Sequence, residues 1–221
     1  MIQVVSQYGA WPVVSGREQE IKPALDLLAT RAGIKLITLG HDYMRLQNTP
    51  ELVGELAVLF FDLAPDIVFC QWEQDNNQDH VAAGEAARIA AIHGACFLSH
   101  PPGAYPVPSE IYHYRGDAQT RNYRPDTYVD VTSVLHDLLQ RCSLFDNIYG
   151  KHIPSATRRV TVVDHLAVDR TVALSWHTEQ KFATSLTDGY QCGVRFAEGF
   201  HAYQARCVGR QALAQLDAQA Q

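Results

Sequence analysis

Two polar stretches that follow predicted strands carry the residues best able to do chemistry. The longer runs from residue 71 to residue 80 and contains Asp75, Asp79 and His80; the shorter is Gly40-His41-Asp42-Tyr43. Carboxylates and imidazoles bind metal ions and transfer protons in hydrolysis. His80 falls on the first turn of a predicted alanine-rich helix, which is a rigid place for a ligand. The two stretches therefore predict a metal or sugar site.

The same residues also have structural interpretations, which their spacing alone favours. Asp79 is a suitable N-cap for the predicted helix, with His80 solvated at the next position. For His41 the favoured interpretation, more strongly than for Asp79, is a polar loop residue after a strand. Trp72 is either a stacking platform for a sugar or a side chain packed on the next helix.

Alternating strand and helix patterns in the first half predict a parallel sheet flanked by helices, which is an α/β, Rossmann-like class. Apolar runs predict buried strands at Ile2–Val5, Ile34–Leu39 and Asp66–Cys70, with a short one at Cys96–Leu98. Helical periodicity covers Arg17–Thr30, residues 49–63 with Thr49 as cap and Pro50 next, and Val81–Ile92. Gly33 and Gly94 suit positions just after helices, and Gly40 suits the end of a strand.

The second half is harder to interpret. Four prolines between Ser99 and Ser109 exclude regular structure there. Strand patterns occur at Ile111–Arg115, Thr127–Val131 and Val160–Val163, and helical patterns at Ser133–Cys142, Thr171–Thr184, Val194–Gln204 and from Arg210 onward. In open parallel sheets, ligands bind beyond the carboxyl ends of the strands, so both polar stretches should lie at one edge.

Composition limits the possible functions. The 221 residues are 47% hydrophobic and 19% charged, with a net charge of −6, which predicts one globular domain over residues 1–221. The acidic balance gives no electrostatic footprint for nucleic acid or an anionic membrane. No apolar run approaches a membrane span, and no signal peptide is evident. Five cysteines without a C-x-x-C spacing favour a reducing, cytoplasmic setting.

Four segments, in order, carry a family resemblance. They are Arg17-Glu18-Gln19-Glu20, the run from Pro65 to Ala83 with Asp75-x-Asn77-x-Asp79-His80, Arg124–Thr132, and Gly193–Phe200. Together they resemble the zinc-dependent N-deacetylases of the PIG-L/LmbE-like family, whose second segment reads P-D-x-V followed by D-x-H-P-D-H-x-A.

The resemblance implies a Rossmann-like fold, one zinc ion, and hydrolysis of an N-acetyl group from an N-acetylglucosamine-type sugar or sugar conjugate. His80 matches a zinc ligand of the family, and Asp79 a neighbouring carboxylate. Asn77 stands where the family often has a histidine; an asparagine can donate a hydrogen bond to an oxyanion but cannot deliver a proton. Candidate substrate contacts are Arg17, Asp42, Trp72 and Asp75.

The sequence departs from the family at its first strand. The family's A-H-P-D-D-E motif, which supplies two ligands and the general base, has no counterpart here, so one strand and one helix are expected to be missing ahead of Met1. Three explanations fit: an incomplete chain, which we favour; a degenerate member without metal; or recruitment of another histidine, with His41, His100 and His113 as candidates. Loss of a central strand would expose unpaired backbone groups.

Two functional hypotheses follow. The first is a zinc-dependent N-deacetylase. The second is a non-catalytic α/β binding or assembly module, which could form a homo-oligomer joined through the exposed sheet edge. A nucleotide-binding protein is disfavoured, because the chain has no G-x-G-x-x-G and its strand ends are acidic.

Overall fold

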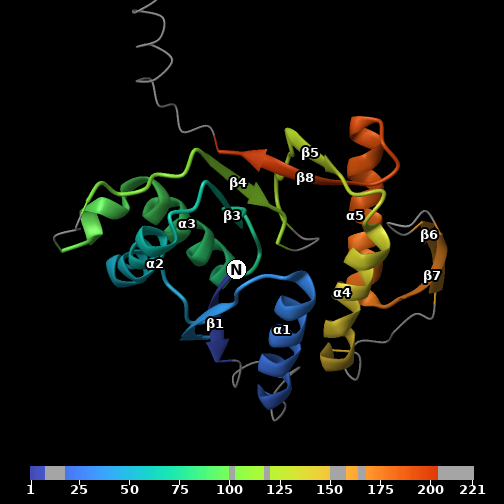
Figure 1. Ribbon diagram of the computed structural model, residues 1–221, viewed down its shortest axis with the longest axis horizontal. Helices are drawn as coiled ribbons and strands as arrows, with labels where there is room; N and C mark the ends of the chain where they lie inside the picture. Colours follow the sequence, from blue (N-terminus) through green and yellow to red (C-terminus); the bar gives the residue numbers. More distant parts are fainter. Residues whose placement is uncertain (8–17, 100–102, 117–119, 150–157, 164–167, 204–221) are drawn as a thin grey trace, which may run out of the picture.

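The computed structural model describes residues 1–7, 18–99, 103–116, 120–149, 158–163 and 168–203. Strands and helices alternate in the first half, and the second half is mixed (Figure 1). In chain order the elements are β1 (Ile2–Gln7), α1 (Glu18–Ala32), β2 (Ile37–Asp42), α2 (Pro50–Leu63), β3 (Ile67–Gln71), α3 (Gln78–His93), a 3₁₀ turn (Gly94–Phe97), β4 (Glu110–Tyr114), β5 (Thr127–Asp130), α4 (Leu135–Tyr149), β6 (Arg158–Val163), β7 (Asp169–Leu174), α5 (Trp176–Cys192) and β8 (Ala197–Ala202).

The described strands form three separate sheets. β1 pairs with β2 and β3 with β4, both in parallel. β8 then runs antiparallel between β4 and β5, and β6 pairs antiparallel with β7. The α/β class is confirmed, while parallel pairing is confined to the first four strands.

Helix α2 forms as its sequence predicts. The Thr49 side chain accepts a hydrogen bond from the Leu52 amide, and Pro50 begins the helix where its missing N–H costs nothing. One face then buries Leu52, Leu56 and Phe60. This face packs on α3, whose alanines allow a close approach.

The main hydrophobic core contains residues from both pairs of parallel strands. α2 and α3 cover Val68 and Cys70 of β3, and the same cluster includes Val4 from β1 and Leu39 from β2. A second core lies where α4, α5, β6 and β7 meet, around Leu135, Leu139, Val162 and Leu174. No helix among the described residues is long and apolar enough to cross a bilayer.

Several predicted elements were wrong. Residues 94–97 form a 3₁₀ turn and not a strand, and Gly94 has a right-handed φ of −55°. Gly40 lies inside β2, where its φ of +88° accommodates an irregular register. The predicted helix at Thr171–Thr184 is the end of β7 followed by α5. The tail after residue 203 lies outside the described residues.

The predicted helix at Val194–Gln204 is strand β8. Phe196 and Phe200 are four residues apart, a spacing that fits one face of a helix but also one face of a strand. The hydrogen-bonded pairing of this segment with β4 and β5 shows that it is a strand.

Candidate functional site

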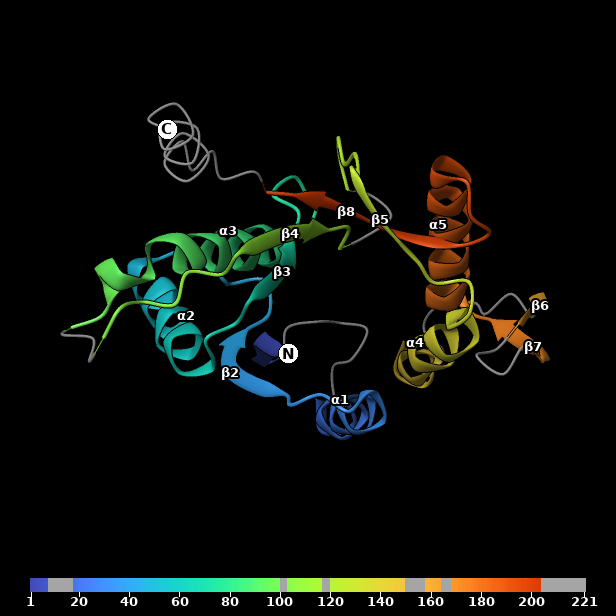
Figure 2. The same ribbon diagram turned by 45° about the horizontal axis from the view of Figure 1, so that its top comes forward.

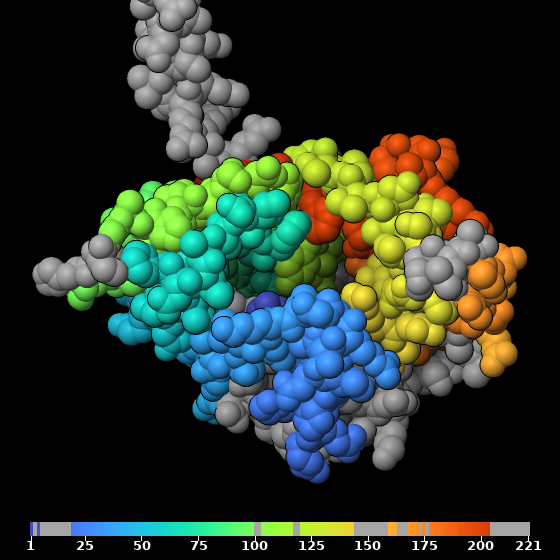
Figure 3. All heavy atoms as spheres, viewed as in Figure 1, coloured from blue at the N-terminus to red at the C-terminus, as the bar shows by residue number. Residues whose placement is uncertain are grey.

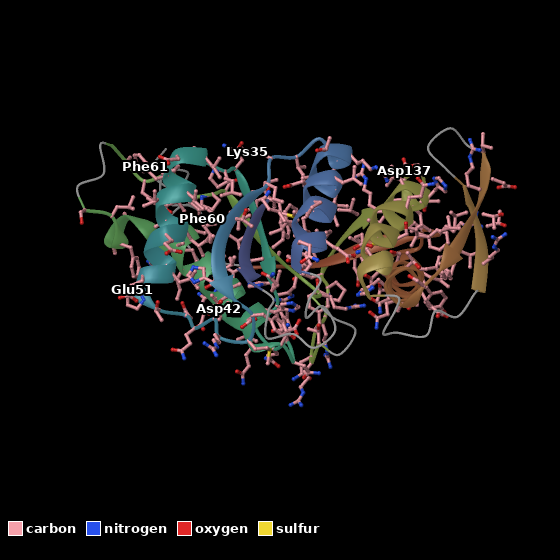
Figure 4. The ribbon with its side chains drawn as sticks, turned by 90° about the horizontal axis from the view of Figure 1, so that it is seen from below. Lys35, Asp42, Glu51, Phe60, Phe61 and Asp137 are labelled. Carbon is pink, nitrogen blue, oxygen red and sulfur yellow. The ribbon has the colours of Figure 1, made fainter. Side chains whose placement is uncertain are left out.

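The carboxyl ends of β2 and β3 meet at one edge, which we call the carboxyl edge. The buried carboxylate of Asp79, on the first turn of α3, accepts hydrogen bonds from the amides of Met44 (2.6 Å) and Leu46 (3.1 Å), which follow β2. Since both strands end at this place, β1, β2, β3 and β4 all run in the same direction. The labels Lys35 and Asp42 mark the two ends of the β2 region in Figure 4.

Asp79 therefore connects the first turn of α3 to the loop after β2. Both carboxylate oxygens of Asp79 accept backbone hydrogen bonds, and only 4% of the residue is exposed to solvent. The N-cap of α3 is Asn77, whose Oδ1 accepts from the Asp79 amide at 2.9 Å, so the alternative that Asp79 is the cap is wrong. The Asn77 amide nitrogen is the part of that side chain that could donate toward an oxyanion.

Asp75 and His80 form a pair at the carboxyl edge. The Nδ1 of His80 lies 3.1 Å from Oδ2 of Asp75, while Oδ1 of Asp75 accepts from the Asn77 amide at 2.8 Å. The Asp75 side chain has no exposed surface, whereas that of His80 is 32% exposed. The carboxylate is thus a buried support, and the imidazole reaches the surface.

The charge on Asp75 fixes the tautomer of His80. Burial acts to raise the pKa of Asp75, but hydrogen bonds from His80 and Asn77 and the charge of His80 outweigh it, so the pKa lies below its usual range. An ionised carboxylate accepts only, and Nδ1 of His80 must then carry a proton. In the neutral ring the other nitrogen, Nε2, is then the acceptor, as in histidines that bind metals or act as bases.

Gly116 lies against this pair, although 36 residues separate it from His80 in sequence. A β-carbon at position 116 would come within 2.6 Å of Oδ2 of Asp75 and 2.8 Å of Nδ1 of His80. The absence of a side chain is therefore what allows the chain after β4 to pass beside the pair. No local motif in the sequence marks this role.

Trp72 lies in a buried aromatic cluster. Trp72 is 9% exposed, and its Nε1 donates a hydrogen bond to the Arg121 carbonyl at 2.9 Å. Its ring makes T-shaped contacts with the rings of His113, Tyr123 and His201. This arrangement favours the packing interpretation over a sugar platform. His113 is also buried, which lowers its pKa despite a hydrogen bond to the Gln71 carbonyl. Its recruitment as a surface ligand is thereby disfavoured.

The loop after β2 borders a shallow pocket of about 290 Å³. Asp42 lines it, as does His41, whose Nε2 lies 2.8 Å from Oε2 of Glu55. The label Glu51 in Figure 4 lies on the same side of the molecule as Asp42. Glu55 was not foreseen from the sequence, since its partner lies 14 residues away. Arg17 and His100 fall outside the described residues.

The donor set does not fit a complete zinc site. Zinc in hydrolases takes three protein ligands and an open position. Among the described residues, no group of three histidine, cysteine or carboxylate side chains is placed to hold a metal ion. His80 contributes a partly exposed ring whose Nδ1 lies on a carboxylate with no exposed side-chain surface.

Solved structures share this fold. The conserved protein TT1542 from Thermus thermophilus superposes with a TM-score of 0.68 at 18% identity, over 91% of this chain and 80% of that one. N,N'-diacetylchitobiose deacetylase from Pyrococcus horikoshii, solved with an inhibitor, gives 0.64 at 18% identity, over 91% and 71%. At this identity the likeness shows a shared fold, which agrees with the fold that the resemblance to the PIG-L/LmbE-like family implies. The resemblance found in the sequence is confirmed at that level.

The deacetylase fold does not by itself assign a reaction. GalB, the 4-carboxy-2-hydroxymuconate hydratase from Pseudomonas putida KT2440, matches as well, with a TM-score of 0.64 at 16% identity over 93% of this chain and 85% of that one. No protein-family model and no curated protein matches the chain. Function must therefore be argued from the site.

Proposed function

We propose that this chain is a hydrolase that removes the N-acetyl group from an N-acetylglucosamine-type sugar or sugar conjugate. The observation that carries the proposal is the imidazole of His80, held through Nδ1 by buried Asp75 at the carboxyl edge. The fold shared with a diacetylchitobiose deacetylase supports the substrate class.

The His80–Asp75 pair has the chemistry that amide hydrolysis needs. With Nδ1 protonated, Nε2 can accept a proton from an attacking water and pass it to the departing amine. Asp75 stabilises the imidazolium that forms between the two transfers, as the carboxylate does in serine hydrolases. The Nδ2 of Asn77 is the proposed donor to the oxygen of the tetrahedral intermediate. Asp79 supports the site by joining it to the loop after β2.

Zinc dependence remains a prediction from the resemblance. The Nε2 of His80 is the atom that would face a metal, but among the described residues it belongs to no group of three side chains that could hold one. Asp42, in the pocket beside the edge, is the proposed substrate contact. A cytoplasmic location also stays a prediction.

The test is product analysis with the purified full chain. Incubation with N,N'-diacetylchitobiose, with and without added zinc, should release acetate and free amine in equal amounts. His80→Ala should lower the rate about 100-fold or more, the usual contribution of a general acid–base group. His136→Ala is the matched control, because His136 also contacts a carboxylate, Asp137, on α4 away from the site.

Other outcomes would refute the enzyme proposal. If the sugar binds but no amine appears under either condition, the non-catalytic binding module is the better account. If His80→Ala and His136→Ala are both fully active, the reaction takes place elsewhere in the chain.

A further inference from the structure

The last residues of β4 lie between the candidate site and the second half of the molecule. Figure 2 shows the carboxyl end of β4 pointing toward α5, and β8, which follows α5 in the chain, pairs with β4. Figure 3 shows a hollow between the blue and green segments of the first half and the yellow of α4. The two halves are therefore not in contact over their whole width, so the contacts of β4 with the second half help to set the geometry of the site.

Arg115, which directly precedes Gly116, is anchored to α5. Its Nη2 lies 3.5 Å from Oδ1 of Asp188, whose side chain is 6% exposed. That oxygen is buried and accepts no hydrogen bond within the described part of the chain. A buried carboxylate oxygen without a hydrogen bond is costly unless a positive charge lies near it. The charge of Asp188 therefore holds the Arg115 guanidinium in place.

The ring of Tyr123 also holds this guanidinium. The Cζ of Arg115 lies 5.2 Å from the centre of the ring, within the range of a cation–π contact. The Tyr123 hydroxyl donates toward the carbonyls of His113 on β4 (3.0 Å) and Gly199 on β8 (2.7 Å). The ring is thus fixed to both strands, and Arg115 is fixed between the ring and Asp188.

A short segment, residues 121–123, holds the loop that carries Asp75 as well. The Arg121 amide donates to the Gln74 carbonyl at 2.9 Å, and Gln74 directly precedes Asp75. The last residue of the segment is Tyr123. One segment therefore contacts both the loop after β3 and the guanidinium at the end of β4.

Gly116 is the residue through which this arrangement reaches the site. It lies against both atoms of the hydrogen bond between His80 and Asp75, since a β-carbon there would come within 2.6 Å of Oδ2 and 2.8 Å of Nδ1. The Asp75 side chain has no exposed surface. A hydrogen bond that is kept from water is electrostatically stronger, so the position of Gly116 affects the strength of this one.

We propose that Arg115 is a positioning residue for the His80–Asp75 pair. Anchored to α5, it keeps Gly116 over the hydrogen bond of the pair and so excludes water from that bond. Arg115 acts through Gly116 and does not touch the substrate. The inference rests on the proposed function only in that the pair carries out the reaction, because the shielding of the bond does not depend on any substrate.

The first measurement is the exchange of the Nδ1 proton of His80 with water, followed by NMR of the full chain with isotope-labelled histidine. The signal is assigned by its loss in His80→Gln. The double variant Arg115→Met/Asp188→Asn removes both charges, which avoids leaving the carboxylate buried and unpaired. We expect exchange in the double variant to be about tenfold faster or more, as expected when a segment opens locally.

Two further variants separate positioning from a general loss of structure. Arg195→Met is the matched control, because Arg195 also lies over an aromatic ring, that of Phe196 at 5.5 Å, but is exposed in the turn between α5 and β8. It should leave the exchange unchanged. Arg115→Lys keeps the charge opposite Asp188 and should stay within about threefold of wild type. Urea denaturation of each variant checks the fold.

Acetate release gives the second readout. We expect kcat to fall about tenfold or more in the double variant, with KM little changed, because the positioning acts on the pair and not on substrate binding. If the wild-type chain releases no acetate, the proposed function is wrong, and the exchange of the His80 proton alone decides this inference.

Three results would overturn the proposal. The first is a His80 proton that exchanges as fast in the wild type as in the double variant. The second is equally fast exchange in Arg195→Met, which would make the effect a general loosening of the fold. The third is a rise in KM with kcat unchanged, which would place Arg115 in substrate binding.

Discussion

His80 is the residue around which the site is built, and its role is set by neighbours that are close in sequence. Asp75, five positions earlier, holds Nδ1, and Asn77 caps the helix that carries the ring. These residues could be selected from the sequence because all three lie in one short segment that follows strand β3. The roles of Asp79 and Trp72 could not, since both depend on contacts with segments more than 30 residues away.

Gly116 gives a prediction at the residue scale. Gly116→Ala would force the Asp75–His80 pair apart, because the new carbon would lie 2.6 Å from Oδ2 of Asp75. We expect kcat/KM for deacetylation to fall about tenfold or more, as when a supporting contact is lost. Gly103→Ala, where a β-carbon would meet nothing within 4 Å, should leave it unchanged. Equal loss in both variants would show that Gly116 has no particular role.

At the scale of elements, α3 packs unusually close to β3. A β-carbon at Gly84 would lie 2.4 Å from the Gln71 carbonyl oxygen, which is backbone and cannot move aside easily. Gly84→Ala is therefore expected to lower the free energy of unfolding by about 1–3 kcal/mol. Urea denaturation measures this change.

Gly54 on α2 provides the matched comparison. A β-carbon there would meet nothing within 4 Å, so Gly54→Ala should raise the free energy of unfolding by about 0.5–1 kcal/mol through helix propensity. If both variants destabilise equally, the close contact between α3 and β3 is not the cause.

Asp188 predicts a pH dependence in the second half of the molecule. Burial raises the pKa of this carboxyl on α5, and Arg115, 3.5 Å away, and the Gly199 amide offset only part of the effect. Because the pKa of Asp188 is higher in the folded than in the unfolded protein, its protonated form stabilises the fold. This stability is fully present below the pKa of the unfolded state, and it is lost as the pH rises through the pKa of the folded state.

Asp188→Asn removes the titrating carboxyl group, so the variant does not lose this stability as the pH rises. Relative to wild type, the variant should therefore gain stability as pH rises from about 3 to about 7, the range over which an aspartate with a raised pKa titrates. Urea denaturation at both ends of the range gives the difference. Asp26→Asn, in an exposed pair with Lys22, should show a smaller change. A constant difference for Asp188→Asn would contradict the assignment.

The elements themselves were predictable where local signals agreed. Thr49 and Pro50 set the start of α2, and Gly33 ends the helix before it with a φ of +65°. Prediction failed at β7, which pairs with the preceding strand β6, and at β8, whose partners β4 and β5 are distant in sequence. The even spacing of Phe196 and Phe200 fits both periods, so only pairing distinguishes them.

At the scale of the whole molecule, the α/β class and the carboxyl edge follow from the order of elements. The described parallel strands fall into two separate pairs, β1 with β2 and β3 with β4. The exposure of Phe69 was not foreseen, because Ile67 to Cys70 reads as a strand buried on both faces.

The most direct test of the proposed site is kcat/KM for acetate release by the wild-type chain and by Asp75→Asn, with the fold of both checked by circular dichroism. Asparagine keeps the size of Asp75 but neither fixes the His80 tautomer nor stabilises its charged form. We predict a loss of about 10- to 100-fold or more, the usual effect of removing a histidine's carboxylate partner. Equal values for the two chains, or no acetate from either, would contradict a catalytic role for the His80–Asp75 pair.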